Sequence, residues 1–184
     1  KRAELEQAAG QVRAAAGPCI YAERPAVLED VVAEQLGASG LSLATAESCT
    51  GGLVSHRLTN VAGSSAWFRG GVVAYANEAK VRDLGVSEAV LQADGAVSAS
   101  VARLMAEGVR ARFGTDLGLG ITGIAGPGGG TAQKPVGLVY CALADARGTD
   151  VKEHRFSGRR AIIKEWSAQM ALDLLRRRLA GIAP

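Results

Sequence analysis

Ser48 stands in a stretch of small residues that could support nucleophilic chemistry. A short apolar segment, Leu41–Ala46, leads into ATAESCTGG at Ala44–Gly52, and a helical pattern begins near Gly51. Backbone N–H groups at the start of a helix bind anions, so a serine nucleophile and an oxyanion site could share this turn. A simpler interpretation is that Ser48 or Thr50 only caps the helix.

Lys80 is the base that the sequence offers for such a serine. A hydroxyl is a weak nucleophile at neutral pH, and His56 would lie two helical turns away from Ser48. A lysine withdrawn from water loses its proton more readily, and Ser–Lys pairs are a variant of serine catalysis. The alternative interpretation of Lys80 is an ordinary solvent-facing lysine. Cys49 is a competing nucleophile, since thiolates are intrinsically more reactive.

Alternating strand and helix patterns predict the elements that position these residues. We expect an α/β layered sandwich with a central mixed β-sheet flanked by helices and a serine-bearing turn at a strand end. The strands are expected at 41–46, 67–76, 117–122, 138–144 and 151–156, and helices at 51–58, 77–84, 87–91, 98–112 and 160–179. Ligands collect at strand ends in such sheets, and Ser48, Tyr75 with Lys80, and Thr122 all fall there.

The hydrophobic pattern also assigns buried faces to the terminal helices. The last helix is expected to turn six residues inward: Ile162, Ile163, Trp166, Met170, Leu174 and Leu175. A helix opening at Pro25 is expected to bury Val27, Leu28, Val31, Val32 and Leu36, and Cys19–Tyr21 is expected to be a short strand. Residues 1–16 carry one apolar face: Leu5, Ala8, Ala9, Val12 and Ala16.

We interpret residues 1–22 as the tail of an upstream domain or linker and residues 23–184 as one domain. The chain begins with Lys1 and not with methionine, which is consistent with a C-terminal piece of a longer protein. The apolar face of residues 1–16 should be covered, and we expect a homodimer to cover it.

Composition narrows the function classes. The 184 residues carry a formal net charge of +3, with three cysteines and two histidines. The charge is too small and dispersed to favour nucleic acid, and the cysteine and histidine spacings match no metal site or disulfide framework. Since no long apolar run or signal peptide is visible, we expect a cytoplasmic protein with no membrane contact. His56 and His154 form no HExxH pair, so we expect no catalytic metal, and we expect no cofactor.

The glycine pattern at Gly118–Gly123 spells GxGxxG but does not predict dinucleotide binding. It lies within an expected strand, whereas the fingerprint requires the turn after a strand and then a helix. Pro127 and the glycines at 128–130 prevent that helix, and no Gly-Lys-Ser/Thr follows to make a P-loop. The stretch Gly126–Gly130 is expected to be a flexible loop, rich in N–H groups, that could wrap a phosphate or act as a lid.

Six motifs together resemble the CinA C-terminal family of nicotinamide-nucleotide amidohydrolases. They are TAESCTGG at 45–52, AGSSAWF at 62–68, YANEAK at 75–80, GAVS at 95–98, ITGIAGP at 121–127 and KPVG at 134–137. The resemblance covers roughly residues 26–180. It implies hydrolysis of the carboxamide of nicotinamide mononucleotide to the acid and ammonia by a Ser–Lys arrangement, without a metal.

The resemblance also implies roles for particular residues. Ser48 would be the nucleophile, Lys80 its base, and Tyr75 and Thr122 helpers. The expected substrate contacts are Glu47, Cys49, Thr50, Gly51, Gly52, Asn77, Gly123, Ile124, Ala125, Gly126 and Arg160. The family usually has Phe-x-Gly-Asp-Arg before its last helix, whereas this chain has FSGRR at 156–160, so Arg159 replaces an acid.

Two other function classes remain open at this point. The domain could be a nucleotide-binding or regulatory module that has lost turnover, which the substitution at Arg159 would allow. It could also be an interaction domain in competence or DNA repair, as the family name suggests. The expected partner of an enzyme is a small nucleotide substrate.

Overall fold

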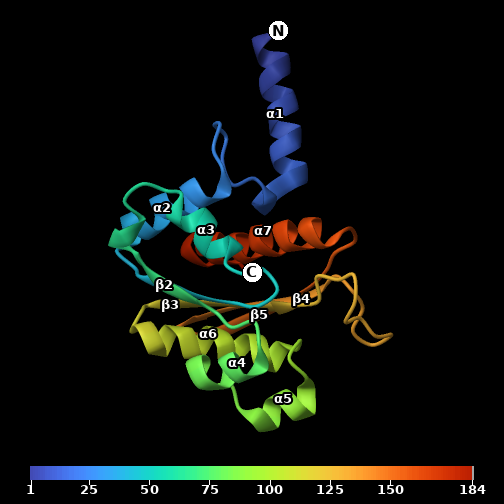
Figure 1. Cartoon of the computed structure of the whole chain (residues 1–184). Helices are drawn as coiled ribbons and strands as arrows, with labels where there is room; N and C mark the ends of the chain where they lie inside the picture. The colour runs from blue at the N-terminus through green and yellow to red at the C-terminus, as the bar shows by residue number, and fades with distance from the viewer. Residues whose placement is uncertain (184) are drawn as a thin grey trace.

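A five-stranded mixed β-sheet lies between two layers of helices in the computed structural model, which describes residues 1–183 (Figure 1). The strand order is β2-β1-β3-β4-β5. β1 is parallel to both β2 and β3, whereas β4 is antiparallel to β3 and β5. The strands are β1 (Leu43–Glu47), β2 (Phe68–Val73), β3 (Leu117–Gly123), β4 (Leu138–Asp145) and β5 (Gly148–Arg155).

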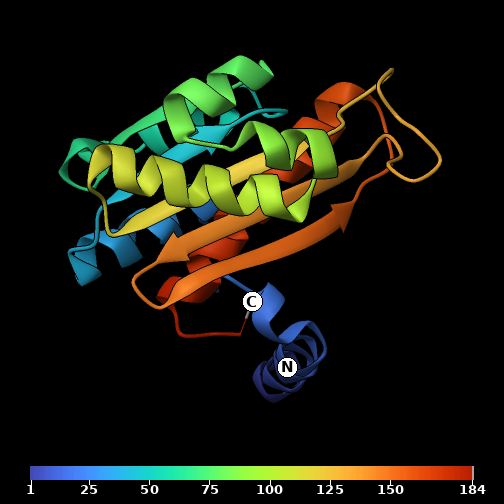
Figure 2. The same cartoon turned by 90° about the horizontal axis from the view of Figure 1, so that it is seen from below.

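The helices divide between the two faces of the sheet (Figures 1 and 2). One layer consists of α2 (Leu28–Ser39), α3 (Leu53–Thr59) and α7 (Arg160–Leu179). The other consists of α4 (Asn77–Leu84), α5 (Glu88–Asp94) and α6 (Ala99–Phe113). Two short 3-10 helices, η1 (Gly17–Cys19) and η2 (Ser64–Ala66), and the N-terminal helix α1 (Arg2–Ala16) complete the chain. The predicted α/β class with a mixed central sheet is confirmed.

Two glycines of β3 allow α6 to lie close against the sheet. A Cβ added to Gly118 would come within 2.1 Å of the Ala106 carbonyl oxygen, and one added to Gly120 within 2.6 Å of the Ala102 carbonyl oxygen. These distances are shorter than any carbon–oxygen contact that packing tolerates. The glycine pattern in this strand therefore serves helix–sheet packing.

The structure corrects two predictions near the N-terminus. Cys19–Tyr21 is not a strand, because the chain forms a 3-10 turn at Gly17–Cys19, and the fixed φ angle of Pro18 suits the first turn of such a helix. The next helix begins at Leu28 and not at Pro25. Val27 precedes this helix in an extended conformation and is half exposed.

The buried face of α7 differs from the predicted one. Ile163, Leu174 and Leu175 are buried as expected, but Ile162 is 43% exposed and Trp166 is 52% exposed. The helix turns small residues toward the sheet instead, with Ser167, Ala168 and Ala171 fully buried. Small side chains let the helix axis approach the strands closely, which places the bulky Trp166 outside.

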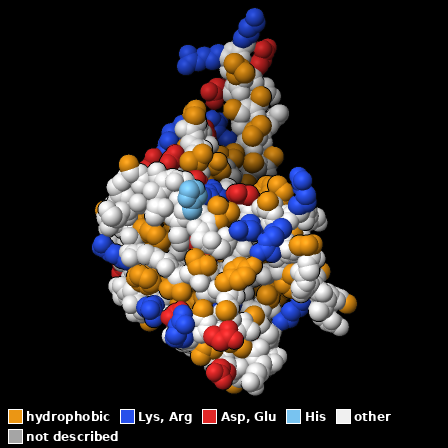
Figure 3. All heavy atoms as spheres, viewed as in Figure 1, with side chains coloured by type: hydrophobic (Ala, Val, Ile, Leu, Met, Phe, Trp, Pro, Cys, Tyr) orange, Lys and Arg blue, Asp and Glu red, His pale blue; other side chains and the backbone are white. Residues whose placement is uncertain are grey.

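Helix α1 projects away from the rest of the chain (Figures 1 and 3). None of its residues is buried, and Leu5 and Val12 remain mostly exposed. The chain's own domain therefore leaves this apolar face open, and the homodimer expected to cover it remains a prediction. Among residues 1–183, no helix is both long and apolar enough to cross a membrane.

Candidate active site

A cavity of about 210 Å³ opens where the carboxyl ends of β1 and β3 meet the residues that follow β2. It is lined by Ser48, Cys49, Tyr75, Asn77, Lys80, Ala96, Val97, Thr122, Gly123, Ala125 and Arg160. Residues from five separate parts of the chain thus meet at one edge of the sheet. A larger cavity of about 600 Å³, bordered by α2, α3 and α7, contains none of the predicted catalytic side chains.

Ser48 is held at the edge of the sheet by main-chain hydrogen bonds. Its N–H group donates to the Ile121 carbonyl of β3 at 3.0 Å, which extends the β1–β3 pairing by one residue. Its carbonyl accepts from the Gly51 N–H group at 3.1 Å, which closes a tight turn. Gly51 and Gly52 complete that turn with φ angles of 63° and 95°, a region that favours glycine. The serine is therefore fixed next to the end of β3.

The carboxylate of Glu47 anchors the start of α3 and lies outside the cavity. Its two oxygens accept from the N–H groups of Gly52, Val54 and Ser55 at 2.8–3.1 Å, and from the Ser55 hydroxyl at 2.6 Å. Glu47 is fully buried. This corrects its expected assignment as a substrate contact, because four donors already occupy the carboxylate.

Lys80 extends a buried amine into the cavity from the second turn of α4. Only 1% of its surface is exposed, and Nζ donates to the carbonyl of Ala74 at 2.9 Å and to that of Tyr75 at 3.4 Å. Burial lowers the pKa of Lys80, and the negative charges that Cys49 and Glu78 can carry offset that effect in part. Asn77 lies one turn earlier on the same helix and also lines the cavity.

Cys49 is a poor candidate for the nucleophile. Burial and, to a lesser degree, the nearby Glu47 carboxylate raise the pKa of its thiol to about 12. The thiol therefore keeps its proton at neutral pH, whereas thiolate is the reactive form.

Thr122 presents an oxygen to the cavity that can accept a hydrogen bond. Its hydroxyl donates to the Ala96 carbonyl at 2.7 Å. A hydroxyl has one proton, so with this bond in place its remaining capacity is to accept. Sequence reasoning did not assign Ala96 or Val97 to the site, although the GAVS motif at Gly95–Ser98 contains both.

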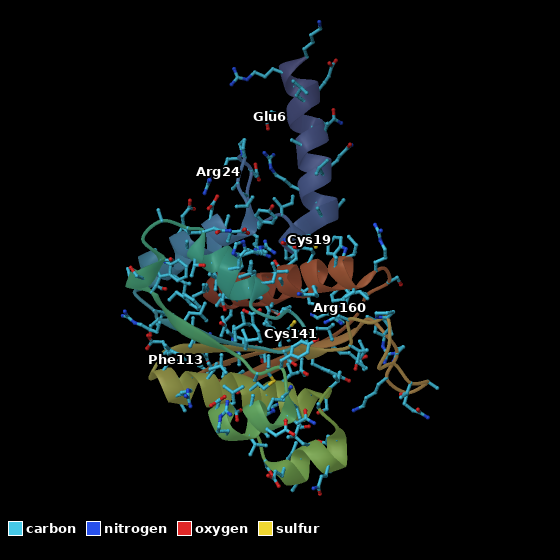
Figure 4. All side chains as sticks on the ribbon, viewed as in Figure 1. Glu6, Cys19, Arg24, Phe113, Cys141 and Arg160 are labelled. Atoms are coloured by element: carbon cyan, nitrogen blue, oxygen red, sulfur yellow. The ribbon has the colours of Figure 1, made fainter. Side chains whose placement is uncertain are left out.

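Arg160 is the first residue of α7 (Figure 4), and its side chain contacts two other parts of the site. One terminal nitrogen donates to the Gly126 carbonyl at 2.8 Å, and the other donates to the Tyr75 hydroxyl at 2.6 Å. Both Arg160 and Tyr75 are exposed at the rim. The substituted Arg159 precedes α7 and is also exposed.

The structure gathers most of the predicted site residues but not all of them. Beyond Glu47, five residues expected to contact substrate do not line the cavity: Thr50, Gly51, Gly52, Ile124 and Gly126. Thr50, two residues after Ser48, is fully buried. Gly126 is connected to the site only through the hydrogen bond that its carbonyl accepts from Arg160. Within residues 1–183, no group of three or more His, Cys, Asp or Glu side chains is placed to hold a metal ion.

Comparisons with known proteins identify the relatives of this chain. The family model described as the CinA C-terminal domain matches residues 26–179. A CinA-like protein of Geobacter sulfurreducens is 56% identical over 168 residues, which cover 91% of this chain and 41% of that protein. Another, from Gemmatimonas aurantiaca, is 52% identical over 96% of this chain and 41% of its own length. The chain thus spans about two fifths of these relatives.

Solved structures show the same fold. The competence/damage inducible protein CihA of Agrobacterium tumefaciens is 40% identical, with a TM-score of 0.79 over 86% of this chain and 99% of its own. A CinA superfamily protein of Klebsiella pneumoniae is 34% identical, with a TM-score of 0.81 over 84% of this chain and 96% of its own.

The role of Glu47 as the anchor of α3 leads to a stability prediction. In Glu47→Gln, the amide NH₂ group would face N–H donors, so at least two of the four hydrogen bonds are lost. We expect the free energy of unfolding to fall by about 3 kcal/mol, since buried hydrogen bonds to charged groups are worth roughly 1.5–3 kcal/mol each.

Urea denaturation measures this loss in the free energy of unfolding. Glu165→Gln, an exposed change on α7, is the control and should leave stability unchanged. Equal midpoints for the two variants would contradict the anchoring role.

Proposed function

The chain belongs to the CinA C-terminal domain family, and we propose that it hydrolyses the carboxamide of nicotinamide mononucleotide to nicotinate mononucleotide and ammonia. The observation that carries this proposal is a buried lysine with a lowered pKa in the same cavity as a serine on a tight turn. Such a pair can deprotonate a hydroxyl and protonate a leaving amine.

In the first half of the proposed reaction, Ser48 Oγ attacks the carboxamide carbon. Lys80 enters this step as the neutral amine and accepts the hydroxyl proton. As the tetrahedral intermediate collapses, Lys80 returns that proton to the nitrogen, the C–N bond breaks and ammonia leaves. In the second half, water attacks the acyl-serine with Lys80 again as base, which releases the acid and restores Ser48.

Main-chain donors are the proposed stabilisers of the oxyanion. The turn from Cys49 to Gly52 follows the proposed nucleophile directly and leads into α3, which begins at Leu53. Fixed donors of this kind often supply the largest single catalytic contribution. The N–H groups of Gly52, Val54 and Ser55 already donate to the Glu47 carboxylate, and that of Gly51 donates to the Ser48 carbonyl. The N–H group of Cys49, which lines the cavity, is therefore the better candidate.

The remaining parts of the rim are proposed to hold the nucleotide. Arg160 carries five N–H donors, and its two bonds to Gly126 and Tyr75 leave others for a ligand. A guanidinium suits phosphate oxygens because its donors are planar and charged. In this proposal, Tyr75 orients Arg160 and, through its main-chain carbonyl, the amine of Lys80.

A second candidate function is a nucleotide-binding module without turnover. One observation favours it: among residues 1–183, the Ser48 hydroxyl makes no hydrogen bond to the Lys80 amine, which donates instead to two main-chain carbonyls. Such a module would bind nicotinamide mononucleotide without releasing ammonia. The names of the relatives also leave open a role in competence or DNA damage.

The nucleophile is tested by two neighbouring substitutions. Ser48→Ala should lower ammonia release from nicotinamide mononucleotide by more than about a thousandfold, because it removes the covalent step. Cys49→Ala should cost far less, since the buried thiol is protonated. Ammonia is measured by a coupled assay, and circular dichroism checks that both variants fold. The opposite ranking would assign the reaction to Cys49.

The pH dependence tests Lys80. The neutral amine is the active form, so kcat/KM should fall as the pH drops through the lowered pKa of Lys80 and level off above it. Lys80→Met should remove most activity and flatten this acidic limb, because the methionine side chain does not titrate. If Lys80→Met kept near-normal rates with the same pH profile, the Ser–Lys mechanism would be wrong.

Arg160 and its neighbour Arg159 form a matched pair for the phosphate contact. Wild type should favour the nucleotide over the dephosphorylated nucleoside by roughly tenfold to a hundredfold in kcat/KM, the effect expected for one or two charge-assisted hydrogen bonds. Arg160→Ala should lower kcat/KM for the nucleotide much more than kcat/KM for the nucleoside, so the ratio of the two should fall. Arg159→Ala should retain it. An Arg160→Ala variant with the full preference would remove Arg160 from the phosphate site.

A further inference from the structure

Lys134 connects two motifs that the catalytic scheme leaves unused, KPVG at 134–137 and GAVS at 95–98. Its Nζ atom donates to the carbonyl of Asp94 and, at 2.7 Å, to the carbonyl of Val97. Asp94 is the last residue of α5, and Val97 lies in the short link to α6. The β3–β4 loop is thus tied to the α5–α6 link by one side chain.

The free main-chain carbonyls at the end of α5 explain why a cation is stabilising next to the α5–α6 link. The last carbonyls of a helix have no intrahelical donor and carry partial negative charge, so an ammonium group next to them is favourable. Gly95 has a φ of +73°, which turns the chain sharply after α5, and a Cβ at this position would lie 3.1 Å from the Lys134 amine. The amine therefore fills the inside of this turn.

The backbone of Lys134 is itself fixed. Its N–H group donates to the Thr131 hydroxyl at 3.0 Å, and its carbonyl accepts from the Thr131 N–H group at 2.8 Å. At its other end, the same loop is held by the bond from Arg160 to the Gly126 carbonyl. Lys134 thus reaches the α5–α6 link from a loop that hydrogen bonds hold at Gly126 and at Thr131.

The link that Lys134 holds is a wall of the catalytic cavity. Ala96 and Val97 line the cavity, and Ala96 lies between the two residues whose carbonyls bind the amine. The Ala96 carbonyl in turn accepts the Thr122 hydroxyl proton at 2.7 Å. A shift of this link would move the Ala96 carbonyl and release the Thr122 hydroxyl to rotate.

We propose that Lys134 is a positioning residue that fixes the Ala96 carbonyl, and through it the Thr122 hydroxyl, in the orientation that accepts a hydrogen bond from the substrate. The catalytic consequence rests on the proposed amidase function. The structural consequence, an ordered Ala96–Val97 wall, does not. Lys134 makes this contribution without touching the substrate.

A double-mutant cycle with Thr122 tests the coupling. Lys134→Met should lower kcat/KM on the order of tenfold in the wild-type background and should cause no further loss in Thr122→Val, because residues that act through one group are not additive. Lys134→Arg keeps a cation with several donors and should recover most of the activity. Lys152→Met, a lysine of β5 outside the cavity, is the control and should match wild type. Losses that multiply in the double variant would overturn the proposal.

Nuclear magnetic resonance separates failure of this proposal from failure of the proposed function. The amide signals of Ala96 and Val97 and the methyl signal of Thr122 should shift in Lys134→Met and return toward wild type in Lys134→Arg. If wild type releases no ammonia but these shifts occur, the amidase proposal fails and the positioning role stands. If the signals do not move in Lys134→Met, the positioning role is wrong, whatever the activity.

Discussion

The site depends on the burial of one amine. Transferring the Lys80 side chain from water to a nearly inaccessible position is unfavourable for the charged form, and two main-chain carbonyls provide its hydrogen bonds. Those carbonyls belong to Ala74 and Tyr75, where the chain leaves β2 and turns into α4. The path of the chain there therefore both accommodates the amine and directs it toward the end of β1.

The Glu47 carboxylate is also placed in a way that favours a neutral Lys80 amine. Glu47 is the buried carboxylate nearest to Ser48 in sequence, and facing Lys80 it would raise the pKa of the amine and keep it protonated. Instead it accepts four hydrogen bonds at the start of α3. This glutamate at the end of β1 thus anchors the helix that follows Ser48, and the carboxylate that acts on the pKa of Lys80 is that of Glu78.

Sequence reasoning predicted the sheet, the strand ends and the serine turn because periodicity and turn residues are local signals. It failed where tertiary packing determines which face of a helix is buried. Trp166 was assigned to the core by its hydrophobicity, but the small residues Ser167, Ala168 and Ala171 set the buried face of α7. The role of Lys134 could not be predicted either, since its carbonyl partners at Asp94 and Val97 lie about forty residues away and have no side-chain signature.

In the proposed reaction, the hydroxyl of Thr122 would distinguish the substrate from the product. With its proton bound to the Ala96 carbonyl, the oxygen can accept from the NH₂ group of a carboxamide. The product carboxylate has only acceptor oxygens, so it would meet an acceptor at the same position and be repelled. The substrate amide would gain one hydrogen bond at this position, whereas the product carboxylate would make an unfavourable contact between two acceptors. Binding of the amide would therefore be favoured over binding of the acid. The pocket would thereby hold the product less tightly than the substrate, provided that the Ala96 carbonyl stays in place.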